Sequence, residues 1–112
     1  MHSHGETNVT PSQMPRHFVF DPQKSATNQH KQGIDFKLAQ RLWDGPTLEF
    51  PIPPPKGRRE MRYLVLGKID EKPFSAIVSY RGWVTRIISV RGSTEMERQH
   101  YADKIKKIEK TH

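Results

Sequence analysis

Cysteine is absent from this chain of 112 residues. Without a thiol the protein can form no disulfide bond, no thiolate nucleophile and no cysteine-based zinc site. The six histidines lie at positions 2, 4, 17, 30, 100 and 112, and no two of them are four residues apart. Because a helical metal site usually needs such a pair, the sequence predicts no metal and no cofactor.

Long apolar segments are missing as well. Only 33% of the residues are apolar, and no run approaches the roughly 20 residues that a membrane-spanning helix requires. No apolar signal segment follows the N-terminus, and there is neither a glycine-rich phosphate loop nor a Gly-x-Ser-x-Gly turn. We therefore expect a soluble, cytoplasmic protein with no membrane segment.

Positive charge is the component in excess. Nineteen Lys and Arg residues stand against 12 Asp and Glu, which gives a formal net charge of +7. Such a field favours a polyanionic partner, either nucleic acid or an acidic protein segment. The chain length suits one domain with a small core.

The first half of the chain reads as a leader followed by a strand and two helices. Residues 1–16 are polar and show no hydrophobic period, which predicts a disordered leader and a single domain over residues 17–112. Residues 17–20 form a short strand. Asp21-Pro22 begins a helix that Gly33 ends, and Asp35 caps a second helix.

From residue 47 the hydrophobic period changes to two. Strands are expected at 47–52, 61–69, 74–80 and 83–90, and the last three should form an antiparallel meander. Thr94 and Glu97 have the spacing of a capping box and begin a basic C-terminal helix. The predicted fold is α+β. It has a small antiparallel sheet, with a meander of three to four strands and a short N-terminal strand, flanked by two N-terminal helices and one C-terminal helix. One core is expected, formed by Phe20, Phe36, Leu42, Leu64, Leu66, Ile77, Val78, Ile87 and Ile88.

Arg86 stands out because it interrupts an apolar strand. In a regular strand it shares a face with Val84, Ile88 and Val90. A guanidinium keeps its charge and is costly to bury without an anion. The anion can be a carboxylate of this protein or a phosphate from outside.

Two groups of polar residues could bind RNA. Lys56, Arg58, Arg59 and Arg62 form a basic segment with only Glu60 against them, which suits contacts to a phosphate backbone or a solubilising loop. The second group consists of Arg86, Ser89, Arg91, Glu97, Arg98 and Tyr101. Ser89 and Arg91 share one face of a regular strand and Arg86 lies on the other, so these residues converge only if the strand bends.

RNA cleavage without a metal needs a base for the 2′-hydroxyl, a proton donor for the leaving oxygen, and cations for the charge on phosphorus. Arg62, Arg86 and Arg91 could supply the charge. Glu60, Glu97 and Tyr101 could carry protons if their pKa values are shifted. Two of these residues also have structural interpretations: Glu97 completes a capping box, and the Tyr101 ring can pack on the sheet.

Three segments resemble the BrnT family, toxins of type II toxin–antitoxin pairs. They are FVFDPQKSATNQHKQGIDFKLAQRLWDGP (18–46), GRREMRYLVLG (57–67) and RGWVTRIISVRGSTEMERQHY (81–101). The resemblance implies a RelE-like fold and a ribonuclease activity that blocks translation. It also implies a hetero-oligomer with a BrnA-like antitoxin, through which the complex contacts operator DNA.

The resemblance also directs attention to particular residues. The matched polar positions are Lys24, Asn28, Lys31, Glu60, Arg62, Arg86, Ser89, Arg91, Glu97 and Tyr101. We take Arg62, Glu60, Arg86, Arg91, Glu97 and Tyr101 as catalytic candidates. RNA-binding candidates are Lys24, Lys31, Lys56, Arg58, Arg59, Ser89 and Arg98. The sequence departs from the family at Gln32, where Lys-His-Gly is usual.

That departure leaves an alternative open. A chain that has lost activity with the histidine could serve as a non-catalytic module that binds nucleic acid or antitoxin. Such a module would act as a co-repressor within a toxin–antitoxin complex.

Overall fold

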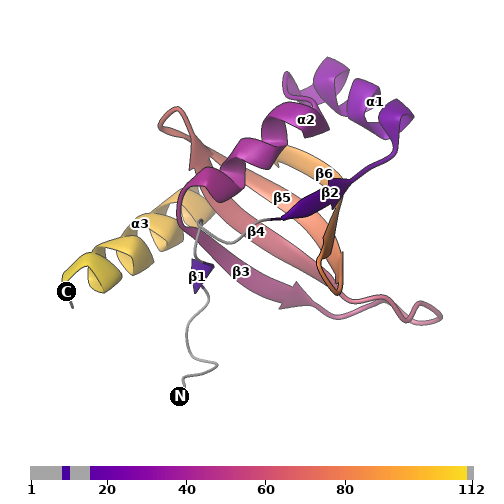
Figure 1. Ribbon diagram of the computed structural model, residues 1–112. Coiled ribbons are helices and arrows are strands. Elements are labelled where there is room, and N and C mark those ends of the chain that lie inside the picture. Colours follow the sequence, from indigo (N-terminus) through magenta and orange to yellow (C-terminus); the bar gives the residue numbers. More distant parts are fainter. Residues whose placement is uncertain (1–8, 11–15, 111–112) are drawn as a thin grey trace.

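The computed structural model describes residues 9–10 and 16–110, which form a six-stranded mixed sheet with helices on both faces (Figure 1). The strand order is β1-β3-β4-β5-β6-β2. In chain order the elements are β1 (Val9–Thr10), β2 (His17–Val19), α1 (Pro22–Gln32), α2 (Phe36–Ala39), the 3-10 helix η1 (Gln40–Asp44), β3 (Thr47–Ile52), β4 (Arg62–Ile69), β5 (Lys72–Arg81), β6 (Val84–Gly92) and α3 (Glu95–Lys110). None of the helices in this part of the chain has both the length and the apolar character needed to cross a membrane.

The α+β class and the antiparallel meander, which runs from β3 to β6, are confirmed. The prediction of a purely antiparallel sheet is wrong, because β2 runs parallel to β6, with His17 opposite Val84. The chain leaves β2 through two helices before it enters the meander, so no tight turn fixes the direction of β2.

The predicted disordered leader is wrong at residues 9–10, which form β1 and pair with Thr47 and Leu48 of β3. Arg16 also contacts the fold, because its guanidinium lies 5.7 Å from the centre of the Trp43 ring. The other residues of the predicted leader, 1–8 and 11–15, lie outside the described residues.

Capping residues set the bounds of the N-terminal helices as the sequence predicts. The Asp21 side chain accepts a hydrogen bond from Gln23 N at 2.9 Å, and Gly33 ends α1 with φ of 77°. The Asp35 side chain accepts from Leu38 N at 2.7 Å and begins α2. Only glycine adopts the Gly33 conformation at low cost, so the helix ends there.

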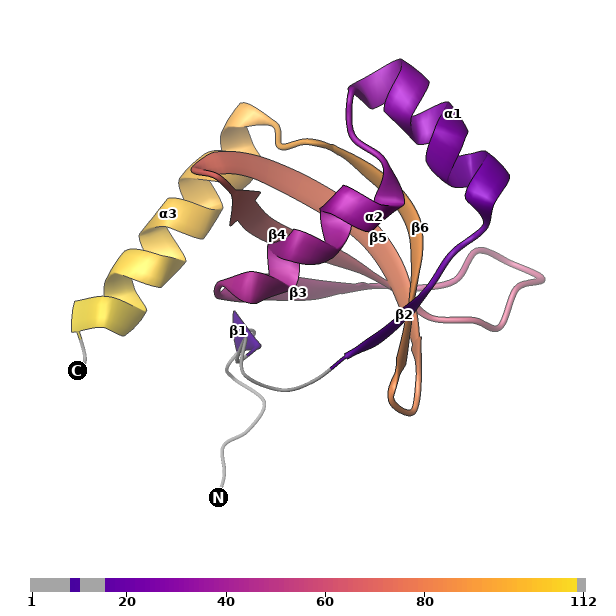
Figure 2. The same ribbon diagram turned by 45° about the horizontal axis from the view of Figure 1, so that its top comes forward.

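The sheet buries apolar side chains on both faces, so the prediction of one core is wrong. Alternate residues of a strand point to opposite faces, and each face has its own cover (Figure 2). The face under the N-terminal helices contains Ile34, Phe36, Ala39, Leu42, Trp43, Val65, Ile69, Ala76, Val78, Ile87 and Val90. The other face packs against α3 through Leu48, Leu66 and Tyr101, with Phe50, Leu64 and Ile105 beside them. Ile77 and Ile88 belong to neither buried cluster.

A β-bulge interrupts the pairing of β5 with β6. Ile77 pairs with Ser89, but the next residue, Val78, pairs with Ile87, which leaves Ile88 as an extra residue on β6. A bulge of this kind reverses the alternation of side chains along the rest of the strand.

The bulge brings Arg86, Ser89 and Arg91 onto one face of β6. Their partners on β5 are Ser79, Ile77 and Ser75, which alternate along a regular strand and therefore share a face. This corrects the regular-strand prediction, which puts Arg86 with Val90 and apart from the other two. Val90 instead points into the core with Ile87, and Arg86 is exposed.

An ion pair between Arg91 and Glu97 holds the start of α3 on the sheet. Arg91 donates two hydrogen bonds to Glu97, at 2.7 and 2.9 Å. Glu97 Oε1 also accepts from Ser75 Oγ at 2.8 Å and from Thr94 N at 2.9 Å, the predicted capping box. These donors, Arg91 foremost, lower the pKa of Glu97 from 4.5 to about 2.

Tyr101 fastens the next turns of α3. Its ring is buried against Leu48 and Leu66, and its hydroxyl donates to Pro46 O at 2.7 Å. Burial raises the pKa of the Tyr101 hydroxyl above its ordinary value. The hydroxyl therefore stays protonated at neutral pH, held in a contact within the fold.

Gly67 tests the packing of the first core. A Cβ atom at this position would lie 2.9 Å from Leu42 Cδ2 and 3.4 Å from Leu42 O, and Leu42 is fully buried. We expect Gly67→Ala to lower the free energy of unfolding by about 1–3 kcal/mol, measured by urea denaturation. Gly92→Ala in β6 is the control, because its Cβ would meet nothing within 4 Å. Equal losses in the two variants would contradict this packing.

The lowered pKa of Glu97 predicts that the free energy of unfolding decreases at acid pH. A carboxyl whose pKa is lowered by folding stabilises the fold above its unfolded pKa, 4.5, and loses this effect as the pH falls toward about 2. We expect Glu97→Gln to reduce the free energy of unfolding at pH 7 by about 1–3 kcal/mol. The difference in the free energy of unfolding between wild type and variant should become smaller below pH 4.5.

The matched control for this pair is Glu95→Gln. Glu95 lies in the same helical turn and pairs with Arg98, but its side chain is largely exposed. Its loss should change stability by less than about 1 kcal/mol. If the loss of unfolding free energy in Glu97→Gln stays constant from pH 7 to pH 2, the role given to the Glu97 carboxylate is wrong.

Candidate functional site

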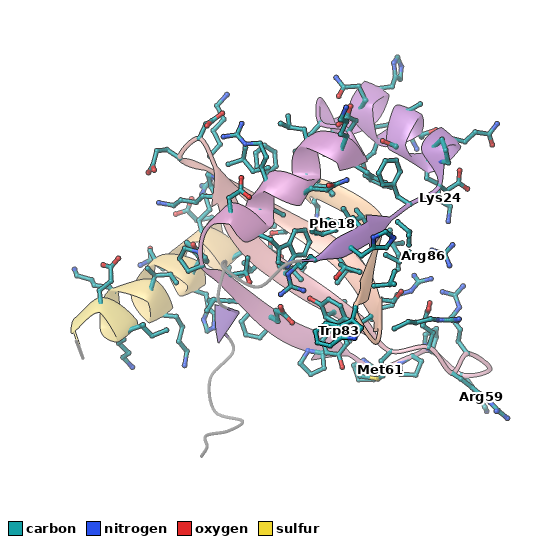
Figure 3. All side chains as sticks on the ribbon, viewed as in Figure 1. Phe18, Lys24, Arg59, Met61, Trp83 and Arg86 are labelled. Atoms are coloured by element: carbon teal, nitrogen blue, oxygen red, sulfur yellow. The ribbon has the colours of Figure 1, made fainter. Side chains whose placement is uncertain are left out.

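Four candidate residues converge on a small cavity of about 50 Å³ between the start of α1 and the sheet. Lys24 comes from α1, Glu60 from the segment before β4, Arg62 from the first position of β4, and Arg86 from β6. Figure 3 shows Lys24 and Arg86 reaching out on the same side of the molecule, above the loop that carries Arg59. The cavity therefore joins residues from three separate parts of the chain: α1, the segment that enters β4, and β6.

Arg62 and Arg86 belong to one row across the sheet. Tyr63 pairs with Val78, so Arg62 is level with Ser79, the next residue of β5. Ser79 in turn pairs with Arg86. Ser79 is small and only 1% exposed, and the two arginines flank it on one face of the sheet. Such a row can present two guanidinium groups to a single anion.

The cations of this cavity are not neutralised by the fold. Among the described residues, no ion pair is formed by Lys24, Arg62 or Arg86. The Nε atom of Arg62 is buried and has no hydrogen-bond partner. A buried donor without a partner is costly to the fold. In the described part of the chain, Arg86 does not form the internal salt bridge that the sequence left open.

Glu60 is the carboxylate of the cavity, together with Asp21. The nearest cation to Glu60 is that of Arg81, whose Nη2 lies 4.0 Å from Glu60 Oε2. Arg81 is exposed, and a pair this long in water holds a carboxylate weakly. Glu60 is therefore free to contact a ligand. Asp21 is already occupied in part, as the cap of α1.

A larger cavity of about 410 Å³ continues from the first along α1. The two cavities share Asp21, Lys24 and Ile88, and the larger one adds Lys31 and Gln32. Lys24 and Lys31 are seven residues apart, so they lie on the same face of the helix. An extended anion could contact both.

Asn28 also lines this larger cavity, but its side chain is engaged within the fold. Its amide donates to Ile34 O at 2.8 Å and to Val90 O at 2.9 Å. Its Oδ1 accepts from Val90 N at 3.2 Å. Asn28 therefore acts as a brace between α1 and β6.

The remaining candidates lie elsewhere. Arg91 and Glu97 are paired with each other, and Tyr101 is bonded to Pro46, at the end of β6 away from the cavity. Arg98 pairs with Glu95 on α3. Ser89 is exposed on the sheet face. The basic residues Lys56, Arg58 and Arg59 lie on the exposed loop between β3 and β4 (Figure 3).

The sequence gives no signal for two residues of this region. Asp21 is recognisable only as a helix cap, yet it lines both cavities. Arg81 lies at a hairpin turn and reaches the site through Glu60. Within residues 9–10 and 16–110, no three His, Cys, Asp or Glu side chains lie close enough together to hold a metal ion.

Comparison with known proteins identifies the family. A model of the ribonuclease toxin BrnT of type II toxin–antitoxin systems matches residues 20–97, which include all four residues that converge on the small cavity. A search of the curated proteins found no match. Because the family model covers more than half of the 112 residues, the chain belongs to the BrnT family of ribonuclease toxins of type II toxin–antitoxin systems.

Proposed function

We propose that this toxin cleaves RNA without a metal ion, at the cavity formed by Lys24, Glu60, Arg62 and Arg86. The observation that carries the proposal is the convergence of three unpaired cations and a loosely held carboxylate on one small cavity. The family implies an RNA target and an antitoxin partner. The residues of the cavity supply the chemical groups that such a cleavage needs.

The proposed reaction is an attack by the RNA on its own backbone. The Glu60 carboxylate accepts the proton of a 2′-hydroxyl, and that oxygen bonds to the adjacent phosphorus. The bond from phosphorus to the 5′-oxygen breaks, and this oxygen takes a proton from the Lys24 ammonium. The products are a 2′,3′-cyclic phosphate and a 5′-hydroxyl, which balance the atoms and protons of the substrate.

Arg62 and Arg86 stabilise the charge that develops on the phosphate during this attack. Each guanidinium presents several N–H donors in a fixed plane, which suits two oxygens of one phosphate. Arg91, Glu97 and Tyr101 take no part in this step, because their polar groups hold α3 on the sheet.

The wider biology follows the family pattern. We propose a RelE-like arrangement, in which the open face of the sheet acts on RNA and translation stops. A BrnA-like antitoxin would neutralise the toxin by covering the same cations in a hetero-oligomer. Opposite charge would speed this association. Contact with operator DNA would occur only through the antitoxin.

Gln32 supports a second candidate function. It lines the larger cavity at a position where the family usually has histidine. If that histidine is essential, this chain would be a non-catalytic module that binds RNA or antitoxin and acts as a co-repressor. RNA binding without cleavage by the wild-type protein would favour this alternative.

Arg86→Ala tests the role of the cation row. Because the charge on phosphate grows in the transition state, we expect kcat to fall by about 100-fold or more, with a smaller change in KM. Arg86→Lys should recover only part of the activity, since a point charge replaces a planar fork. Single-turnover cleavage of a labelled RNA measures both effects.

The control for this experiment is Arg41→Ala. Arg41 is an exposed arginine that pairs with Asp70 at the opposite end of β4, so the variant loses the same charge far from the cavity. Its cleavage rate should match that of wild type. If Arg86→Ala folds normally and cleaves at the wild-type rate, Arg86 does not belong to the site.

The metal-independent mechanism predicts full activity in excess EDTA. In this mechanism Arg62, Arg86 and Lys24 supply the positive charge, so removal of divalent ions should leave the rate within about twofold of its value without EDTA. The assay uses purified toxin on RNA with EDTA alone and with Mg²⁺ restored. Activity that disappears with EDTA and returns with Mg²⁺ would overturn the mechanism.

A further inference from the structure

Trp83 is a large apolar residue left in water at the tip of the β5–β6 hairpin. It is 78% exposed, whereas Trp43 is buried in the core. The turn is Gly82-Trp83, and of these two only Gly82 has a positive φ, 57°. This is the pattern of a type II′ turn, which calls for glycine first and has no need of an aromatic ring second. The turn therefore does not explain the indole.

The backbone of this hairpin tip is held by a hydrogen bond to β2. The carbonyl of Trp83 accepts a hydrogen bond from His17 N, at the start of β2, at 3.4 Å. Arg81, on the other strand of the hairpin, is 4.0 Å from Glu60. A ring on a backbone that is already fixed loses little conformational entropy when a ligand stacks on it.

The surroundings of Trp83 are cationic. Arg81 precedes the turn, and residues 56–62, which reach it through the Arg81–Glu60 contact, carry four more basic residues. In Figure 3, Trp83 and Met61 lie at the base of the loop that extends to Arg59. An aromatic ring among cations is typical of surfaces that bind single-stranded nucleic acid.

Glu60 connects this surface to the candidate site. It pairs with Arg81 beside Trp83, and it lines the cavity that also contains Arg62 and Arg86. A strand of RNA with one phosphate at the two arginines would therefore have a neighbouring base close to the hairpin tip.

We propose that Trp83 is a stacking platform for an unpaired base next to the phosphate that is cleaved, which makes single-stranded RNA the substrate. This inference rests on the proposed function. In a duplex each base is stacked between its neighbours, and neither of its faces is open to the indole. An unpaired base of any identity can stack, so Trp83 selects for single strands more than for sequence.

The test measures affinity and cleavage on a short labelled single-stranded RNA and on the same RNA annealed to its complement. Trp83→Ala should weaken binding of the single strand by about 5- to 140-fold, the equivalent of one lost base–aromatic stack. Trp83→Phe, which keeps a ring, should bind nearly as well as wild type. Binding of the duplex should be weak and unaffected by either variant.

Met96→Ala is the matched control. Met96 is 81% exposed at the start of α3, beyond the opposite end of β6 from Trp83. The Met96→Ala variant loses an exposed apolar side chain far from the site, and its affinity for RNA should equal that of wild type. Melting temperatures of all three variants establish that each one folds.

Unchanged affinity of Trp83→Ala for the single strand would overturn the proposal. If the same variant also forms a weaker complex with the antitoxin, or a smaller oligomer in size-exclusion chromatography, the hairpin tip is a protein contact instead.

The result for Trp83 is separable from the proposed mechanism. Loss of cleavage in Arg86→Ala with no effect of Trp83→Ala would preserve the mechanism and refute the stacking. Weaker binding by Trp83→Ala in a protein that cleaves no RNA would support the stacking and refute the mechanism.

Discussion

Both backbone groups of Val90 are bonded by one side chain, that of Asn28. Strand β2 pairs with β6 at residues 84–86. Within residues 9–10 and 16–110, no strand lies beside Val90 on the outer edge of β6, and the amide of Asn28 takes the place of one. The same amide bonds Ile34 O. Helix α1 is thereby fixed against the sheet just beyond the bulge. Lys24, one helical turn before Asn28, then comes to the cavity that contains Arg86, four residues before Val90.

The helices cover one face of the sheet more extensively than the other, and the two faces therefore have different roles. The face under α1, α2 and η1 is filled with apolar side chains. On the other face α3 covers one end, where Arg91 is neutralised by Glu97. Arg86 lies on this same face of the same strand but has no carboxylate partner among the described residues. One arginine therefore stabilises the fold, while the other keeps its charge available.

Local signals in the sequence were enough for the helices and the meander, but not for β1, for the direction of β2 or for the convergence of the site. Asp21, Gly33 and the Thr94–Glu97 box act within a few residues of chain, so the helix bounds could be predicted. The bulge depends on pairing with another strand, and strict alternation therefore placed Arg86 on the wrong face.

The five-residue spacing between Arg86 and Arg91 was nevertheless a clue. Residues an odd number apart share a face only when a strand carries an extra residue, so two arginines with a common partner at this spacing would indicate a bulge. The neighbourhood of Lys24 and Glu60 had no comparable signal, because it depends on how α1 lies over the finished sheet.

The parallel pairing of β2 with β6 also has a consequence for biosynthesis. His17 is among the first residues of the domain to be synthesised, and its partner Val84 follows 67 residues later. Lys24 and Arg86 are separated by almost as much chain. Contacts this distant in sequence form late, since the intervening loop must first be closed. A nascent chain that stops before β6 contains neither the second arginine of the cation row nor the strand on which α1 is braced. The candidate site can therefore assemble only after nearly the whole toxin has been translated.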